Sequence, residues 1–192
     1  MAVVNLFHRW YCRSKGWARV MQEFVVPAVL SGIDLGDDVL EIGPGPGVVT
    51  DWLRTRVSRL TSVEIDHALA QSLKRRMEGT NVTVVEGDAT AMEFPDSSFS
   101  AAVCFTMLHH VPSPELQDRL LAEACRVLRP GAVLAGSDST PSLMWNIYHL
   151  FDTRVPVDPA GFPARLERAG FLGVTVTTHP RGGFSFRARK PS

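Results

Sequence analysis

Three alternating glycines most constrain what this chain can fold into: Gly43, Gly45 and Gly47. They follow an apolar stretch, residues 39–42, which is typical of a buried strand and carries an acidic residue, Glu41. Residues 47–57 then have a helical pattern. Glycines at such a strand-to-helix turn supply positive φ angles and let a ligand approach the bare backbone. The run therefore predicts an α/β fold with a nucleotide-type site after its first strand.

The spacing of these glycines argues against a dinucleotide. The dinucleotide fingerprint is G-x-G-x-x-G, which requires glycine or alanine where Val48 stands. Pro44 and Pro46 also remove backbone donors that would bind a pyrophosphate. Taken alone, the motif is also compatible with a glycine turn that binds nothing. The choice between a ligand site and a plain turn therefore depends on the residues at the ends of the later strands.

Length, charge and cysteine content set broad limits. A chain of 192 residues is long enough for one domain with a substantial core. Its 20 basic and 20 acidic side chains cancel, so no overall field attracts nucleic acid. The three cysteines, Cys12, Cys104 and Cys125, lack C-x-x-C spacing, which indicates neither a disulfide framework nor a zinc site.

The sequence indicates no targeting or membrane-spanning segment. The first residues lack a clean apolar stretch ahead of a small-residue cleavage site. No run approaches the ~18 apolar residues of a spanning helix. We therefore expect a cytoplasmic protein.

Strands and helices alternate after residue 36. Further strands are expected at residues 60–65, 82–85, 101–105 and 132–136. Asp66 and Ser113 are expected to cap the helices that follow the second and fourth of the five strands. The helix after Ser113 is expected to stop at residues 129–131, whose sequence is Arg-Pro-Gly.

The C-terminal part departs from this alternation. After a helix over residues 158–170, two alternating stretches, 174–177 and 184–187, lie on either side of a glycine turn, which predicts a β-hairpin. The whole order predicts a mostly parallel sheet with helices on both faces, finished by that hairpin. We expect an N-terminal helical lid or cap segment at 1–36 and a core at 37–192, within a single domain overall.

The run from Glu41 to Gly47 resembles the first motif of the class I S-adenosylmethionine-dependent methyltransferases, an acidic residue followed by G-x-G-x-G. The resemblance extends from about Asp37 to Leu134 and includes Phe94-Pro95-Asp96 and Arg129-Pro130-Gly131 as landmarks of the small-molecule and lipid methyltransferase group. Two mild departures are Ser100 in place of an aspartate and Ala132 in place of a glycine. The resemblance implies a Rossmann-like, doubly wound, seven-stranded α/β sheet, mostly parallel with a C-terminal antiparallel hairpin.

The resemblance also implies S-adenosylmethionine as cofactor. The glycine loop is expected against its methionine part, with Glu41 ordering the amino end. Glu64 stands 17 positions after Gly47, at the end of the second strand, where an acidic residue accepts bonds from ribose hydroxyls. Either Glu64 or Asp88 alone is as easily a solvated charge at a strand end. Asp88 and Ala89 are expected beside the adenine. The full set of expected cofactor-binding residues is Glu41, Gly43, Gly45, Gly47, Glu64, Asp88, Ala89 and the backbone of Phe105.

The two adjacent histidines after the fourth strand, His109 and His110, are candidate catalytic residues. One of them is a candidate general base for a hydroxyl or ammonium acceptor. The preferred alternative is that one packs under the cofactor and the other caps the next helix. Adjacent residues cannot both face a metal in a regular element, and no third ligand is evident, so no metal is expected.

The first half of the chain also resembles the ribosomal RNA adenine dimethyltransferases. In those enzymes an Asn-Leu-Pro-Tyr or Asn-Pro-Pro-Tyr segment holds the flipped base. Here the segment after the fourth strand is Phe105-Thr106-Met107-Leu108. Because that motif is missing and the net charge is zero, nucleic acid is not expected as a partner.

We expect two aromatic segments outside the sheet to line the acceptor pocket. The alternative, for much of each segment, is that its aromatic side chains simply pack on the sheet. Its expected residues are Trp10, Tyr11, Trp145, Tyr148 and His149. Residues 3–24 are basic as well as aromatic, as in helices that lie on a membrane surface, so peripheral membrane contact is a further possibility.

The sequence thus predicts methyl transfer by in-line displacement to a small, apolar or lipid-like acceptor. The alternatives are a relative of the ribosomal RNA methyltransferases and a non-catalytic subunit that binds S-adenosylmethionine. The identity of the acceptor and the oligomeric state are left open.

Overall fold

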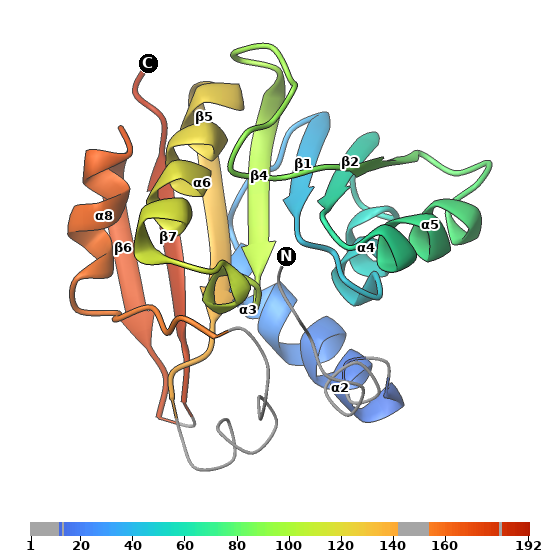
Figure 1. Cartoon of the computed structure of the whole chain (residues 1–192), viewed down its shortest axis with the longest axis horizontal. Helices are drawn as coiled ribbons and strands as arrows, with labels where there is room; N and C mark the ends of the chain where they lie inside the picture. Colours follow the sequence, from blue (N-terminus) through green and yellow to red (C-terminus); the bar gives the residue numbers. More distant parts are fainter. Residues whose placement is uncertain (1–11, 13, 142–153, 181) are drawn as a thin grey trace.

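Seven strands form one mixed sheet in the order β3-β2-β1-β4-β5-β7-β6 (Figure 1). The computed structural model describes residues 12, 14–141, 154–180 and 182–192. The strands are β1 (Asp38–Ile42), β2 (Arg59–Glu64), β3 (Val82–Glu86), β4 (Phe99–Phe105), β5 (Leu128–Asp138), β6 (Leu172–Thr178) and β7 (Phe184–Arg189). The first five run parallel, whereas β7 runs antiparallel to both β5 and β6. The predicted fold class is confirmed.

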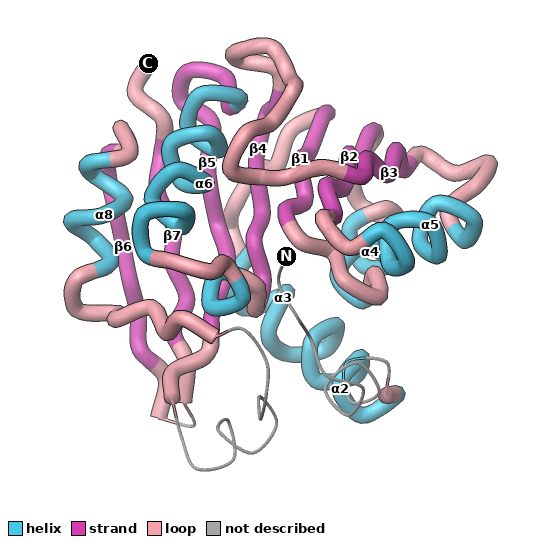
Figure 2. The backbone as a smooth tube through the Cα atoms, in the orientation of Figure 1, coloured by secondary structure: helices cyan, strands magenta, loops and turns pink. Residues whose placement is uncertain are grey.

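Helices cover both faces of the sheet (Figure 2). They are α2 (Lys15–Val20), the π-helix η1 (Met21–Val25), α3 (Val26–Leu30), α4 (Val48–Leu53), α5 (His67–Arg76), the 3₁₀ turn η2 (Leu108–His110), α6 (Pro114–Val127) and α8 (Phe162–Arg168). The predicted caps are confirmed: Asp66 accepts a bond from Leu69 N at 2.9 Å and Ser113 accepts one from Leu116 N at 3.3 Å. In the part of the chain that the structure describes, no helix is long and apolar enough to cross a membrane.

Successive residues of β1 enter two separate apolar clusters because side chains alternate across a strand. Leu40 and Ile42 pack with α6 and α8 on one face. Val39 packs with residues of η1, α3 and α4 on the other. Both faces of the central strands are therefore buried, as expected for a parallel sheet. The carboxyl ends of β1, β2 and β4 meet at one edge, which places the expected site.

The segment at 26–30 belongs to the second cluster, where Val26, Val29 and Leu30 are buried with Val103 of β4. Residues 15–30 are helical, which agrees with the helical pattern expected there. The division into a lid at 1–36 and a core at 37–192 stays a prediction.

One strand boundary differs from the sequence prediction. The expected break at residues 129–131 lies inside β5, which begins at Leu128 directly after α6. Leu128 pairs with Phe99, and the register then shifts before Ala101. Gly131, with φ of 76°, lies between the residues of β5 that pair before and after this shift. Its amide donates to the carbonyl oxygen of Lys190, the residue after β7, at 3.0 Å.

We predict that Gly136→Ala destabilises the sheet strongly. A Cβ at Gly136 would lie 1.9 Å from Cys104 O and 2.7 Å from the ring of Phe186, so the backbone would have to move. Overpacking of this kind costs about 3 kcal/mol, or roughly 6–12 °C in melting temperature for a domain of this size. Thermal unfolding measures the loss. Gly16→Ala in α2, where a Cβ would meet nothing within 4 Å, is the control. Similar melting temperatures for the two variants would contradict the prediction.

Candidate functional site

The glycine loop connects β1 to α4 at the carboxyl edge of the sheet. Gly43, Gly45 and Gly47 have φ angles of 67°, 54° and 85°, which favour glycine. Gly43 N donates to Val63 O at 2.9 Å, so the β1–β2 pairing continues one residue into the loop. The loop is therefore built on the ends of two neighbouring strands.

The three glycines are needed for different reasons. A Cβ at Gly43 would lie 2.9 Å from Met107, the second residue after β4. A Cβ at Gly47 would lie 2.2 Å from Arg76 Nη2 and 2.5 Å from Leu73, both in α5. At Gly45 a Cβ would meet nothing within 4 Å. The middle glycine thus borders open space, where a ligand has room to approach the backbone.

The carboxylate of Glu41 is buried beneath this loop, with 3% of the residue exposed. Its Oε2 accepts bonds from Thr50 Oγ1 and Ser62 Oγ, both at 2.7 Å. Its Oε1 has no hydrogen-bond partner among the described residues. Burial raises the pKa of Glu41 to about 7, against the opposing effect of the two hydroxyl bonds. A buried acceptor without a donor fits a site for an ammonium group or its bridging water.

The Glu64 carboxylate lies at the end of β2 and is 6% exposed. Oε2 accepts a bond from Gly45 N and Oε1 accepts one from Asp66 N, each at 2.9 Å. Burial raises the pKa of Glu64 although both amide bonds oppose the rise. A carboxylate has about four acceptor positions, so ribose hydroxyls can share it with these amides.

The loop after β3 lies beside the end of β2, because Gly87 N donates to Glu64 O at 3.0 Å. Asp88 is exposed, and its Oδ1 accepts a bond from Thr90 N at 2.8 Å, which shapes a tight turn. Ala89 is buried. The structure therefore brings the Asp88–Ala89 loop next to Glu64, as the sequence predicted. Whether either residue binds adenine stays a prediction.

Phe105 ends β4 and is buried within the second cluster. The next residue, Thr106, has φ of 50° and donates its amide to Ser137 O at 2.7 Å. This places the backbone after Phe105 against the end of β5. Its expected contact with the cofactor stays a prediction.

The histidines lie in η2, directly after that turn. His109 is 2% exposed; its Nδ1 bonds to Asp138 Oδ1, and its backbone amide donates to Asp138 Oδ2 at 3.0 Å. The ring of His110 lies 4.1 Å from that of His109, centroid to centroid. The expectation that one histidine caps the next helix is wrong, because Ser113 provides that cap. Among the described residues, no three His, Cys, Asp or Glu side chains gather as a metal site requires.

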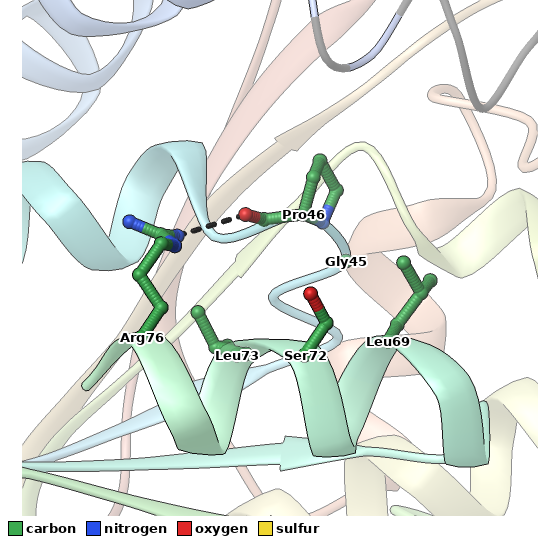
Figure 3. A pocket seen from close by; sticks show the side chains of 6 residues that line it. All are labelled: Gly45, Pro46, Leu69, Ser72, Leu73 and Arg76. Atoms are coloured by element: carbon green, nitrogen blue, oxygen red, sulfur yellow. Dashed lines mark hydrogen bonds between the residues drawn. The ribbon is translucent and has the colours of Figure 1, made fainter. Parts of the chain in front are cut away.

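Two site features were not predicted from the sequence. The first is Asp138, at the end of β5, which is hydrogen-bonded to His109. In the sequence it is marked only by its position after an apolar strand. The second is a cavity of about 230 Å³ between the glycine loop and α5 (Figure 3). Its lining residues are Gly45, Pro46, Leu69, Ser72, Leu73 and Arg76.

The expected acceptor residues lie outside the residues that the structure describes. They are Trp10, Tyr11, Trp145, Tyr148 and His149. Their role in a substrate pocket stays a prediction.

Comparison with known proteins gives a family match over half of the chain. Residues 40–136 match the family model described as a methyltransferase domain. A probable ribosomal RNA small subunit methyltransferase A from Thermococcus onnurineus is 40% identical over 77 residues, which cover 40% of this chain and 27% of that protein. The matches to the curated relatives span between 22% and 50% of those proteins' lengths.

Solved structures share the fold at low sequence identity. A methyltransferase from Haloferax volcanii, solved with the Trm112 methyltransferase activator, has a TM-score of 0.77 and 16% identity, covering 97% of this chain and 96% of that one. An N-methyltransferase 2 of Haemonchus contortus, solved with phosphomonomethylethanolamine and S-adenosylhomocysteine, has a TM-score of 0.74 and 15% identity. It covers 98% of this chain, and this chain covers 61% of it.

We predict that the ionisation of Glu41 makes the folded state less stable as pH rises. The folded pKa is about 7, above the ordinary value of 4.5. Between these values the folded protein keeps a proton that the unfolded chain has lost, so stability falls as pH rises from 4.5 to 7. The loss is roughly 3 kcal/mol once Glu41 is fully ionised.

Urea unfolding at several pH values between 5 and 8 measures this dependence. Glu41→Gln is expected to flatten it, leaving a smaller slope from Glu64, whose pKa is also raised. The exposed Glu93→Gln variant serves as the control and is expected to follow the wild type. Parallel profiles for wild type and Glu41→Gln would sink this assignment.

Proposed function

The chain belongs to the methyltransferase domain family, within the class I S-adenosylmethionine-dependent methyltransferases, and we propose that it methylates a small, apolar or lipid-like acceptor. The observation that carries the cofactor half of this proposal is the buried Glu41 Oε1. It has no donor within the part of the chain that the structure describes, and it lies beneath a glycine loop that is open at Gly45. The residues at this edge fit the cofactor.

Four positions would hold the cofactor. Glu41 would order its amino group, and the backbone at Gly45 would border its methionine part. Glu64 would accept the ribose hydroxyls, and the loop at Asp88 and Ala89 would border the adenine. The bound cofactor supplies a sulfonium methyl group, which is a reactive donor for in-line displacement.

The protein's main contribution to catalysis is then to position the acceptor relative to the methyl group. Holding an acceptor in line with a methyl donor supplies about 7–11 kcal/mol of the barrier without a covalent enzyme intermediate. Exclusion of water from the acceptor also contributes. Little side-chain chemistry is required for this, which agrees with a site dominated by backbone and buried carboxylates.

His109 is the candidate for removing a proton from the acceptor. The Asp138 carboxylate already accepts hydrogen bonds from the backbone amides of His109 and Ser139, so its bond to His109 Nδ1 assigns the hydrogen to Nδ1 and orients the ring. A fixed tautomer of this kind suits a general base. The burial of His109 equally suits the packing role that the sequence favoured, in which it lies under the cofactor.

The described part of the N-terminal helix supports an apolar or membrane-associated acceptor. Phe24 is 61% exposed and Val20 is 45% exposed, although both are large apolar residues. Lys15 and Arg19 are exposed on the same helical segment, where Arg19 forms an ion pair with Glu23 at 3.0 Å. Apolar and basic side chains together are typical of a helix that lies at a membrane surface.

Ribosomal RNA methylation is the second candidate, favoured by the names of the curated relatives. Those matches span at most half of the relatives' lengths. The segment Phe105-Thr106-Met107-Leu108 stands where those enzymes would hold a base, and the net charge of the chain is zero. A non-catalytic subunit that binds the cofactor is the third candidate.

We predict that the protein transfers labelled methyl groups from S-adenosylmethionine into the organic-soluble fraction of an extract from the source cells. Polar, protein and RNA fractions are counted separately. Label in RNA would favour the second candidate. Binding of the cofactor without transfer to any fraction would favour the third.

We predict that Phe24 contributes to vesicle binding. Phe24→Ser is expected to weaken the affinity for vesicles of mixed neutral and anionic phospholipid by about tenfold, because an aromatic side chain that would insert into the membrane is lost. The fraction of protein that sediments with the vesicles measures this affinity. Leu172→Ser is the matched control, because Leu172 is 59% exposed but lies in the edge strand β6. Equal sedimentation of the two variants would contradict membrane contact through this helix.

A further inference from the structure

Arg76, the last residue of α5, reaches across to the glycine loop (Figure 3). Its Nη1 donates to both carboxylate oxygens of Asp51, at 2.6 and 2.7 Å. Its Nη2 donates to Pro46 O at 2.9 Å and to Gly47 O at 3.3 Å. One guanidinium therefore joins α5 to the loop and to the first turn of α4.

The loop is thus held at two points, one at the end of β2 and one in α5, the helix that follows β2. On one side, Glu64 Oε2 accepts the amide hydrogen of Gly45. On the other, Arg76 binds the carbonyl oxygen of the next residue, Pro46. Pro46 has no amide hydrogen, so its carbonyl is its only backbone hydrogen-bonding group. These two contacts act together with the hydrogen bond from Gly47 N to Pro44 O, at 2.9 Å, which closes the turn around Gly45.

The packing of α5 against Gly47 supports the same conclusion. Any side chain at Gly47 would collide with Arg76 and Leu73, so the helix and the loop lie in direct contact. A flat guanidinium fork can bind a carboxylate and a carbonyl together, whereas the single ammonium group of a lysine cannot match both. Arg76 is exposed like its neighbours Lys74 and Arg75, and it is distinguished by its bonds to Asp51 and to the loop.

We propose that Arg76 is a positioning residue for the cofactor. It holds the glycine loop from the α5 side, so that the open face at Gly45 and the Glu64 carboxylate keep the relative position that the cofactor needs. This inference rests on the proposed function. The contact matters most when the cofactor is bound, because ribose hydroxyls then share the Glu64 carboxylate with the Gly45 amide.

Calorimetric titration of the full chain with S-adenosylhomocysteine tests the inference. Arg76→Ala is expected to weaken binding by about tenfold, since small displacements of a binding loop have effects of at least this size. Arg76→Lys is expected to recover part of the loss, because it keeps a positive charge near Asp51. Arg75→Ala, the neighbouring exposed position, is the control and is expected to bind within about twofold of the wild type.

Thermal unfolding of the unliganded variants separates positioning from general stability. Arg76→Ala is expected to melt within about 3 °C of Arg75→Ala, because exposed ion pairs contribute little to stability. A large loss of melting temperature that accompanies the loss of binding would overturn the positioning role. Binding by Arg76→Ala that equals binding by Arg75→Ala would also overturn it. Failure of the wild type to bind would overturn the proposed function itself.

Discussion

The Glu64 carboxylate accepts hydrogen bonds from the amides of Gly45 and Asp66, and the rest of the site depends on these two contacts. The first fixes the glycine loop after β1, and the second fixes the turn that starts α5. Since α5 then carries Arg76 back to the loop, β2, α5 and the loop form a closed set of contacts. The protein's own contacts therefore hold the loop in place, which reduces the ordering that binding would require.

This arrangement has an energetic cost at the two buried carboxylates. Burial raises the pKa of Glu41 and of Glu64, so each is easier to protonate than an exposed glutamate. One oxygen of Glu41 accepts hydrogen bonds from two hydroxyls, and the other has no donor among the residues that the structure describes. A ligand that brought a positive charge or a donor to that oxygen would remove the penalty. Groups whose environment opposes their charge are common at functional sites for this reason.

The sequence predicted those parts of the fold that local patterns determine. The strands follow from apolar stretches of the right length, and the caps at Asp66 and Ser113 follow from short-range hydrogen bonding. Glu41 followed from a motif in which strand and loop are adjacent in the chain, and Glu64 followed from its position at the end of the second strand, 17 residues after Gly47. The contacts that were missed join distant residues: Arg76 to Pro46, His109 to Asp138, and Gly131 to Lys190. No local pattern encodes such pairs, because the sheet order brings them together.

The same distinction explains why the cofactor half of the site is easier to identify than the acceptor half. Members of one cofactor-dependent family share the part of the chain that is expected to hold the cofactor, so similarity over residues 40–136 carries little information on the acceptor. The expected acceptor residues lie outside that range, and Phe105–Leu108 differs from the base-binding segment of the ribosomal RNA enzymes. The matches to relatives of that name span at most half of those proteins' lengths, so they support the cofactor more strongly than they support RNA. The proposal of an apolar acceptor rests instead on the exposed Phe24 and Val20, which lie outside residues 40–136 and are therefore independent of the family match.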